Sequence, residues 1–206
     1  MFRTLVNNKI AQSLVFFAEN TPSELYLTKA LKLLYILDEI SIRESGVPVT
    51  WLDYKVWKLG PVAESIYEEL RYGIAENCKG ISVGLTNALQ VKTVPNPVND
   101  EKESFIIIAK THFDKDEFSD YELELLQKIA DDYGHLSSTK LVEKLHETGT
   151  LWDKMVESKK LQKQFELQSN RSNHIIDFTE LVNGKTHKEM AYKAAFDSMS
   201  FQEHLF

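Results

Sequence analysis

The sequence predicts a mainly α protein of the α+β class, a helical bundle around a buried central helix with a small β-hairpin. Apolar residues recur at the three- and four-residue spacing of helices in most segments of the chain. The segment 28–45 is apolar nearly all round, which is typical of a helix buried on every side. Two short stretches, 89–94 and 105–109, are rich in β-branched residues, as strands are.

The composition is that of a globular protein. Of its 206 residues 43% are hydrophobic and 27% are charged, which is close to the usage of soluble domains. No apolar run approaches the roughly 20 residues of a membrane span, and the first residues lack the apolar stretch of a secretory signal. The single cysteine, Cys78, cannot form an intramolecular disulfide. We therefore expect a cytoplasmic protein without a membrane partner.

The first two predicted helices cover 9–19 and 28–45. The first has apolar residues three and four apart and is ended by a Thr-Pro-Ser break. We expect Thr28 to cap the second helix, and Gly46 to supply the left-handed residue that commonly ends one. The second helix is the predicted centre of the bundle.

The next region combines extended chain with a third predicted helix. Residues 47–50 and 54–58 read as extended or irregular, because a proline and clustered β-branched and aromatic residues lie there. Proline suits the first turn of a helix, where its missing N–H has no partner to lose. A helix is therefore predicted from Pro61 to about Tyr72, with Gly73 as its end.

The middle of the chain is predicted to form a hairpin and then a helix. The strands 89–94 and 105–109 can pair across a loop longer than usual. Ser119 followed by Glu122 is a capping box, and the apolar spacing after it predicts a helix that ends at Gly134.

A further helix completes the body. It is predicted to start at Ser137 or Ser138 and to stop at Gly149, after which Leu151 and Trp152 fold back onto the body. This arrangement predicts a compact two-helix hairpin with the preceding helix.

The composition changes after Trp152, which suggests two parts. We predict a domain over 1–153 and a C-terminal helical extension over 154–206. The extension holds a polar helix-like stretch at 159–168, a linker-like segment at 169–173 and a last helix with a capping box at Thr186.

Charge and missing motifs restrict the function. The net charge of -7 argues against a mainly electrostatic nucleic-acid binder and favours a basic partner. The six histidines form no HExxH pair and one cysteine cannot supply a zinc box, so neither a metal nor a cofactor is expected. The serine-hydrolase, nucleotide-phosphate and dinucleotide motifs are missing from the sequence. We expect a protein that is not an enzyme.

Two alternative functions stay open. A hydrolase or transferase could assemble a dispersed site that joins His146 with Asp38 or another carboxylate. A DNA-binding regulator could use the two short helices within 119–147 as a helix-turn-helix. The simpler expectation is that Asp38 reaches a polar edge or pairs with a Lys or Arg, that His146 is a core histidine bonded to backbone, and that Cys78 is inert.

Two sets of side chains are candidate contacts for a protein partner. Large aromatic residues surround Gly60-Pro61, and aromatic residues near an irregular turn often anchor interfaces. Acidic residues precede the helix that begins after Ser119, where the helix dipole favours them and a basic protein could meet them. The predicted contact residues are Trp51, Tyr54, Trp57, Asp114, Asp116 and Glu117.

Several motifs, taken together, resemble a known family. They are Leu31-Lys32-Leu33-Leu34-Tyr35, Trp57-Lys58-Leu59-Gly60-Pro61-Val62, Tyr67-Glu68-Glu69-Leu70, Tyr133-Gly134-His135-Leu136-Ser137 and the stretch from His146 to Trp152. In this order, over residues 9–153, the chain resembles the Panacea domain family of SocA-like antitoxins and phage-associated GepA-like proteins.

The resemblance implies a mostly helical domain with a small β element that acts as an antitoxin. Its members neutralise toxins encoded beside them, and the SocA-like member is a proteolytic adaptor that delivers its toxin to the ClpXP protease. The family assigns no catalytic residue, so we expect the Trp57, Gly60 and Pro61 motif to define the fold first. The segment 154–206 lies outside the resemblance, and we expect it to decide which toxin is captured.

Overall fold

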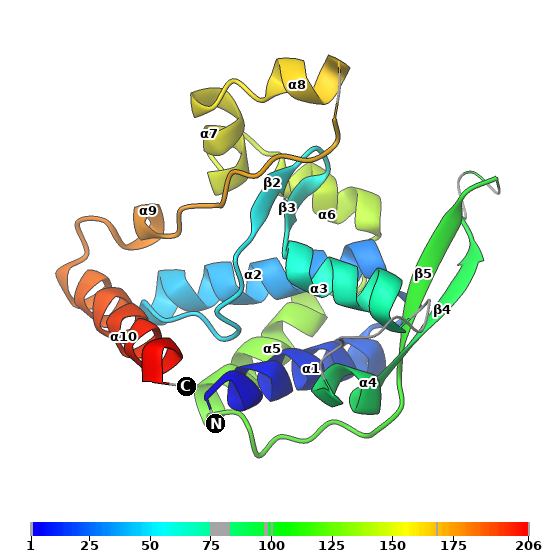
Figure 1. The fold of residues 1–206 in the computed structure, drawn as a ribbon, viewed down its shortest axis with the longest axis horizontal. Coiled ribbons are helices and arrows are strands. Elements are labelled where there is room, and N and C mark those ends of the chain that lie inside the picture. The colour runs from blue at the N-terminus through cyan, green and yellow to red at the C-terminus, as the bar shows by residue number, and fades with distance from the viewer. Residues whose placement is uncertain (1, 75–82, 97–98, 100, 168, 206) are drawn as a thin grey trace.

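The protein is mainly helical with two small antiparallel sheets (Figure 1), which confirms the predicted fold class. The computed structural model describes residues 2–74, 83–96, 99, 101–167 and 169–205. Cys78 lies outside these residues. None of the described helices is both long and apolar enough to cross a bilayer.

Helix α2 (Leu27–Ser45) is the central element, as the sequence predicts. It contacts α1 (Phe2–Asn20) and helices from the later part of the chain, and most of its side chains are buried. Gly46 ends it in the left-handed conformation, at φ 87°. The predicted cap at Thr28 is wrong, because the helix begins one residue earlier and Tyr26 is its N-cap residue without a side-chain hydrogen bond. The short strand β1 (Leu25–Tyr26) leads directly into the helix and fixes this start.

The larger sheet has three strands in the order β1, β5, β4. Strands β4 (Leu89–Pro95) and β5 (Glu103–Ala109) pair antiparallel in register from Leu89 opposite Ala109 to Pro95 opposite Glu103, so the predicted hairpin is confirmed. Helix α1 and the short α4 (Val83–Ala88) pack at this sheet. The sheet therefore closes one end of the helical core.

The smaller sheet is a tight hairpin of β2 (Lys55–Trp57) and β3 (Gly60–Val62), with Trp57 opposite Gly60. The helix predicted from Pro61 is therefore wrong at its start. Pro61 pairs with Val56, and the helical chain begins later as α3 (Glu64–Glu68), followed by a π-helical turn over Glu69–Ile74. Gly60, at φ 96°, allows the two-residue turn that brings proline into a strand of an edge hairpin.

Two of the later helices, α5 and α6, begin at their predicted caps. Ser119 and Glu122 form both bonds of the capping box, and Ser137 accepts a hydrogen bond from the N–H of Lys140. The helix predicted to start at Ser137 or Ser138 ends at Leu145, with His146 as its C-cap residue, rather than at Gly149. The chain then turns into a separate helix that starts at Leu151. The elements are α5 (Asp120–Tyr133), α6 (Ser138–Leu145), α7 (Leu151–Ser158), α8 (Gln162–Leu167), α9 (Thr179–Val182) and α10 (Thr186–Leu205).

The segment between α8 and α9 runs along the β2–β3 hairpin, as the orange chain in Figure 1 shows. The N–H of Val56 donates to the carbonyl of His174 at 2.8 Å, and the N–H of Ile176 donates to the carbonyl of Tyr54 at 2.8 Å. Farther on, Phe178 and apolar residues of α9 are buried in the same core as α2. Residues after 153 therefore complete the packing of residues before it.

Candidate partner-binding site

Motifs that lie far apart in the sequence meet at the β2–β3 hairpin. The Nζ atom of Lys32, from the central helix, donates a hydrogen bond of 2.7 Å to the carbonyl of Pro61. A Cβ atom at Gly60 would lie 3.1 Å from this Nζ atom, so glycine leaves space for the lysine as well as allowing a positive φ. This contact between Lys32 and the hairpin explains why the motif of the central helix and the Gly60-Pro61 motif occur together.

A tryptophan from α7 closes the other side of the hairpin. Trp152 Nε1 donates to the carbonyl of Trp57 at 2.8 Å, and its ring stacks on the ring of His146 with centroids 3.6 Å apart and planes 4° from parallel. Within the described chain, Nε2 of His146 is buried without a hydrogen-bond partner, while its backbone N–H donates to the carbonyl of Val142. Burial, and then the charge of Lys32, lower the pKa of His146. The histidine ring thus serves packing, although we expected it to be bonded to backbone.

A groove lies over this cluster. Its volume is about 410 Å³, and apolar side chains from α2, the hairpin and α3 form its walls. Burial lowers the pKa of Lys32, which lies at the groove, to about 7. The groove is lined by Leu27, Thr28, Leu31, Lys32, Trp57, Lys58, Leu59, Val62, Tyr67 and Asn170.

Trp57 joins the groove to the C-terminal segment. The guanidinium of Arg171 lies 4.3 Å from the centre of a Trp57 ring and 5.3 Å from that of Tyr67. The two aromatic rings are themselves 5.1 Å apart and meet edge to face. Trp57 is only 9% exposed, so among the predicted contacts it is mostly a wall of the site, while the exposed rim is the turn residue Leu59, at 58%.

The other predicted contact residues lie elsewhere. Trp51 is half-buried in the loop after α2, at φ 56°, and Tyr54 is fully buried, so the Tyr54 side chain is not available on the surface. Asp114 and Asp116 are exposed and Glu117 is half-buried in the loop between β5 and α5. Figure 1 places this loop at the bottom of the molecule and the β2–β3 hairpin at the top. The structure therefore does not bring the acidic and aromatic sets onto one face.

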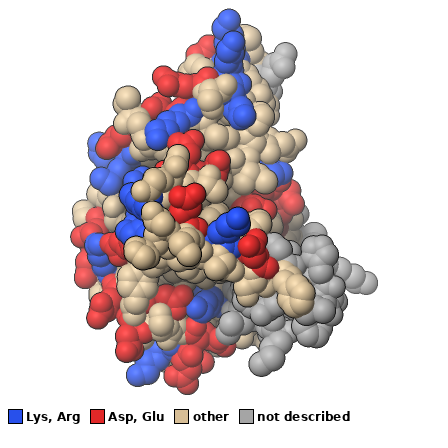
Figure 2. Space-filling model, turned by 90° about the vertical axis from the view of Figure 1, so that its left-hand side faces the viewer, with Lys and Arg blue, Asp and Glu red and all other residues tan. Residues whose placement is uncertain are grey.

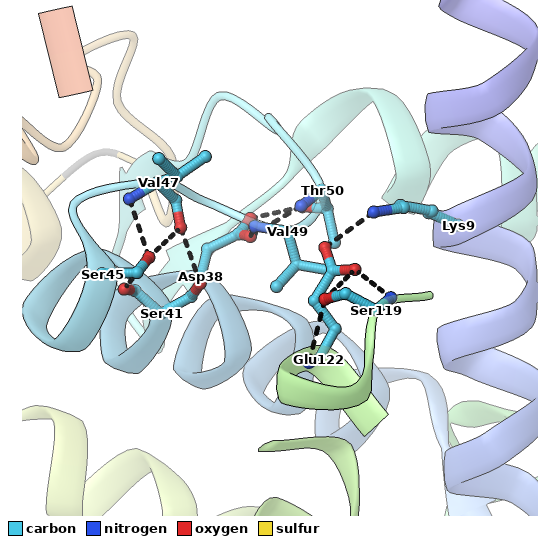
Figure 3. A network of polar contacts seen from close by, with 9 residues as sticks. All are labelled: Lys9, Asp38, Ser41, Ser45, Val47, Val49, Thr50, Ser119 and Glu122. Atoms are coloured by element: carbon cyan, nitrogen blue, oxygen red, sulfur yellow. Dashed lines mark hydrogen bonds and ion pairs between the residues drawn. The ribbon is translucent and has the colours of Figure 1, made fainter. Parts of the chain in front are cut away.

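Asp38 is fully buried and fixes the loop after α2 (Figure 3). Its Oδ1 accepts the N–H groups of Val49 and Thr50, each at 2.8 Å, and its Oδ2 accepts the hydroxyls of Thr50 and Tyr54. The expectation that Asp38 reaches a polar edge or pairs with Lys or Arg is therefore wrong, because the carboxyl group is fully buried and is surrounded by backbone and hydroxyl donors. Burial raises its pKa to about 6, although these hydrogen bonds oppose the rise.

The structure gives no support to the two alternative functions. The described hydrogen bonds of Asp38 go to its own loop and to Tyr54, whereas the ring of His146 lies on Trp152, so these two residues do not form one catalytic pair. In the described part of the chain no group of three or more His, Cys, Asp or Glu could hold a metal. The outer face of α5 exposes Asp131 and Asp132, which would repel a DNA backbone.

A second, acidic groove lies between α9 and α10, with a volume of about 800 Å³. The helix α10 exposes large apolar side chains, among them Phe196, which lines the groove, at 54% and Met190 at 64%. Figure 2 shows acidic and basic side chains intermixed on the side of the molecule that carries α10, without one continuous patch of either sign. The groove is lined by Asp177, Thr179, Glu180, Val182, Asn183, Glu189, Tyr192, Lys193, Phe196 and Asp197. Sequence reasoning missed this site, although the acidic and aromatic residues of the last helix were its signal.

A family model described as "Antitoxin SocA-like, Panacea domain" matches residues 31–153. This span contains the hairpin and its contacts with Lys32, His146 and Trp152. It stops within α7, before the groove of α9 and α10. No curated protein and no solved structure matches the chain.

Proposed function

This chain belongs to the family of SocA-like Panacea antitoxin domains, and we propose that it works by capturing and neutralising a partner toxin. The observation that carries the proposal is the family match over residues 31–153, most of the helical body. A function of this kind needs a surface for a protein and no reacting groups. The buried Asp38 carboxyl, which is saturated with donors from its own loop, and the stacked ring of His146 fit such a non-enzymatic role.

The acidic groove between α9 and α10 is the capture surface that we propose. Four carboxylates, one lysine and the exposed Phe196 line it, and α10 also exposes Met190. Buried aromatic anchors supply most of the free energy of protein binding, and surrounding charges select the sign of the partner. We therefore expect a toxin with a basic surface and an apolar centre. The groove lies outside the span shared with the family, which suits an element that chooses one toxin among many.

The acidic loop of Asp114, Asp116 and Glu117 and the half-buried Trp51 stay candidate secondary contacts. We further propose that neutralisation proceeds as in the SocA-like case, with the captured toxin delivered to the ClpXP protease. If the toxin is delivered, its lifetime in the cell depends on both this protein and the protease. Simple blocking needs only the complex.

Capture can be tested by co-expression of this chain with the reading frame beside its gene. We expect rescue of growth and recovery of the neighbouring product on the tagged protein. Phe196→Asp should abolish recovery, while Leu167→Asp, which changes an apolar residue 78% exposed on α8, should leave it unchanged. Failure of both rescue and recovery with the unaltered chain would refute the proposed function.

The mode of neutralisation has its own measurement. The half-life of the toxin is followed in cells with and without ClpX, in the presence of this protein. A half-life that lengthens without ClpX supports delivery. A half-life independent of ClpX, with growth still rescued, means that the complex alone blocks the toxin.

A further inference from the structure

The groove over the β2–β3 hairpin continues into a neighbouring hollow. The two share Thr28 and Leu59, and their volumes are about 410 and 460 Å³. Together they follow the surface from the hairpin past the start of α2 towards α6, with Leu59 as the exposed ridge between them. A hollow of this elongated form suits an extended peptide segment better than a compact molecule. The second hollow is lined by Ser23, Glu24, Tyr26, Thr28, Lys29, Leu59, Asn96, Ser104, Leu136, Ser137, Ser138, Thr139 and Val142.

The charges around this groove are opposite in sign to the net charge of the chain. The protein has 31 acidic and 24 basic residues, yet the charged residues that line the first hollow are Lys32 and Lys58, without an Asp or Glu. The second hollow adds Lys29 and one acid, Glu24. The guanidinium of Arg171 lies over the ring of Trp57, which lines the first hollow. An anionic group would be the favoured occupant on electrostatic grounds.

The buried polar groups at the groove are donors with spare capacity. In its protonated form Lys32 carries three N–H groups, and among the described residues its Nζ atom has one acceptor, the carbonyl of Pro61. The side chain of Trp57 is almost wholly buried, and its Nε1 atom has no acceptor within the described chain. Buried donors normally have acceptors, so these two groups point to an oxygen-bearing ligand.

The N-terminus of α2 adds to the positive electrostatic potential at the groove. Tyr26, the N-cap residue, offers no side-chain hydrogen bond to the first turn, and the positive end of the helix dipole lies there. The desolvation that lowers the pKa of Lys32 reflects a cation held without a counter-charge. A carboxylate in the groove would supply that charge, while Leu27, Leu31 and Val62 would cover apolar neighbours of the acid.

We propose that this groove binds an extended segment of a partner protein in which an acidic side chain is flanked by apolar residues. The site is separate from the acidic groove of α9 and α10 and has the opposite charge. It therefore goes beyond toxin capture by that groove, and each can fail without the other.

The probe for this site is a random dodecapeptide library displayed on phage and selected against the full-length protein. We expect enriched peptides with Asp or Glu beside Leu, Ile or Phe. A fluorescein-labelled copy of the best peptide should lose at least tenfold in affinity when its acid is replaced by the amide, a change that leaves the protein intact. Enrichment of basic peptides, or equal binding of the amide copy, would overturn the proposal.

Protein variants locate the site. Lys58→Glu and Leu59→Asp alter the exposed turn and should each weaken binding of the labelled peptide at least tenfold. Lys163→Glu makes the same charge change as Lys58→Glu at an exposed position of α8 and should leave the affinity unchanged. Circular dichroism verifies that the variants fold. If all three variants bind equally, the peptide lies elsewhere and the proposal is wrong.

Two further outcomes decide between occupants. Displacement of the peptide by millimolar phenylacetate as readily as by unlabelled peptide would identify a small-molecule site and overturn the proposal. Concentration-dependent dimerisation of the unaltered chain that Leu59→Asp abolishes would identify a second copy as the occupant, with the same consequence. A monomer whose peptide complex resists phenylacetate supports the protein-segment site.

Discussion

Replacement of Asp38 by asparagine tests how the buried carboxyl group stabilises the loop after the central helix. Val49 and Thr50 donate their N–H groups to Oδ1, and an asparagine oxygen can accept both. Tyr54 has one hydroxyl proton, and the two nearest acceptors are Oδ2 of Asp38 at 2.8 Å and the carbonyl of Leu34 at 2.9 Å, with Oγ1 of Thr50 farther away at 3.3 Å. When Asp38 is ionised, the tyrosine proton goes to the carboxylate. When Asp38 is protonated, its own O–H can donate to Tyr54, which then donates to Leu34.

Asparagine therefore mimics the protonated acid, and the magnitude of the effect follows from the pKa. Burial raises the pKa of Asp38 from an ordinary 3.8 to about 6, so the folded protein holds this proton more tightly than the unfolded chain. The resulting stability is fully present below the ordinary value and is lost as the pH rises through about 6. A difference of one unit in pKa corresponds to 1.36 kcal/mol, so protonation of Asp38 contributes about 3 kcal/mol to the free energy of unfolding at low pH. About 2 kcal/mol of this contribution is lost between roughly pH 4.5 and 7.5.

Urea unfolding of the two proteins between about pH 4.5 and 7.5 measures this effect. We expect the free energy of unfolding of Asp38→Asn, relative to the unaltered protein, to increase by about 2 kcal/mol over this range. Because the two free energies of unfolding are subtracted, the contributions of the other titrating groups cancel. Asp53→Asn, a change of the same chemistry at an exposed position, is the control and should give no such trend. A difference between Asp38→Asn and the unaltered protein that is constant with pH would contradict the reasoning.

Three further changes test the packing around the hairpin and the C-terminal segment, each by urea unfolding. Gly60→Ala should lower the free energy of unfolding by about 1 kcal/mol more than Gly149→Ala does, because both glycines have positive φ but only Gly60 is crowded by a neighbouring side chain. Equal losses of stability would argue against this crowding. Trp152→Phe should cost about 1 to 3 kcal/mol, since it leaves the hairpin carbonyl without its donor, and a neutral result would show that water replaces it. Phe178→Ala should lower the free energy of unfolding by about 3 to 5 kcal/mol. Truncation after Asn183 should lower it by less, because the truncated chain keeps the Phe178 ring. The reverse order would mean that α10 holds the segment in place.

The parts of the fold that the sequence predicted correctly depend on local signals. The capping box at Ser119 and the left-handed glycine at position 46 act within one turn of a helix, so neighbouring residues suffice to identify them. The near-continuous apolar surface of 28–45 likewise predicted the buried central helix.

The errors arose where distant residues decide the structure. Proline at position 61 suits a helix start as well as an edge strand, and the choice is made by its pairing with Val56 and by the hydrogen bond from Lys32. Asp38 was expected to reach a polar edge or to pair with Lys or Arg, but it is buried and its backbone donors come from a loop whose path no local pattern specifies. The acidic groove requires α9 and α10 to lie against each other, which spacing alone does not indicate.

The hairpin motif has a structural role that accounts for its place in the family pattern. Lys32 binds the carbonyl of Pro61, Gly60 leaves space for the lysine, and Trp152 binds the carbonyl of Trp57, so each residue depends on the others. A sequence that keeps these contacts keeps the fold, whatever it binds. The motifs therefore identify the family, while we expect the choice of partner to fall to residues outside them, on the exposed rim of the groove and on α10. For this reason variants of the rim and of α10, rather than of the motif, separate binding from folding.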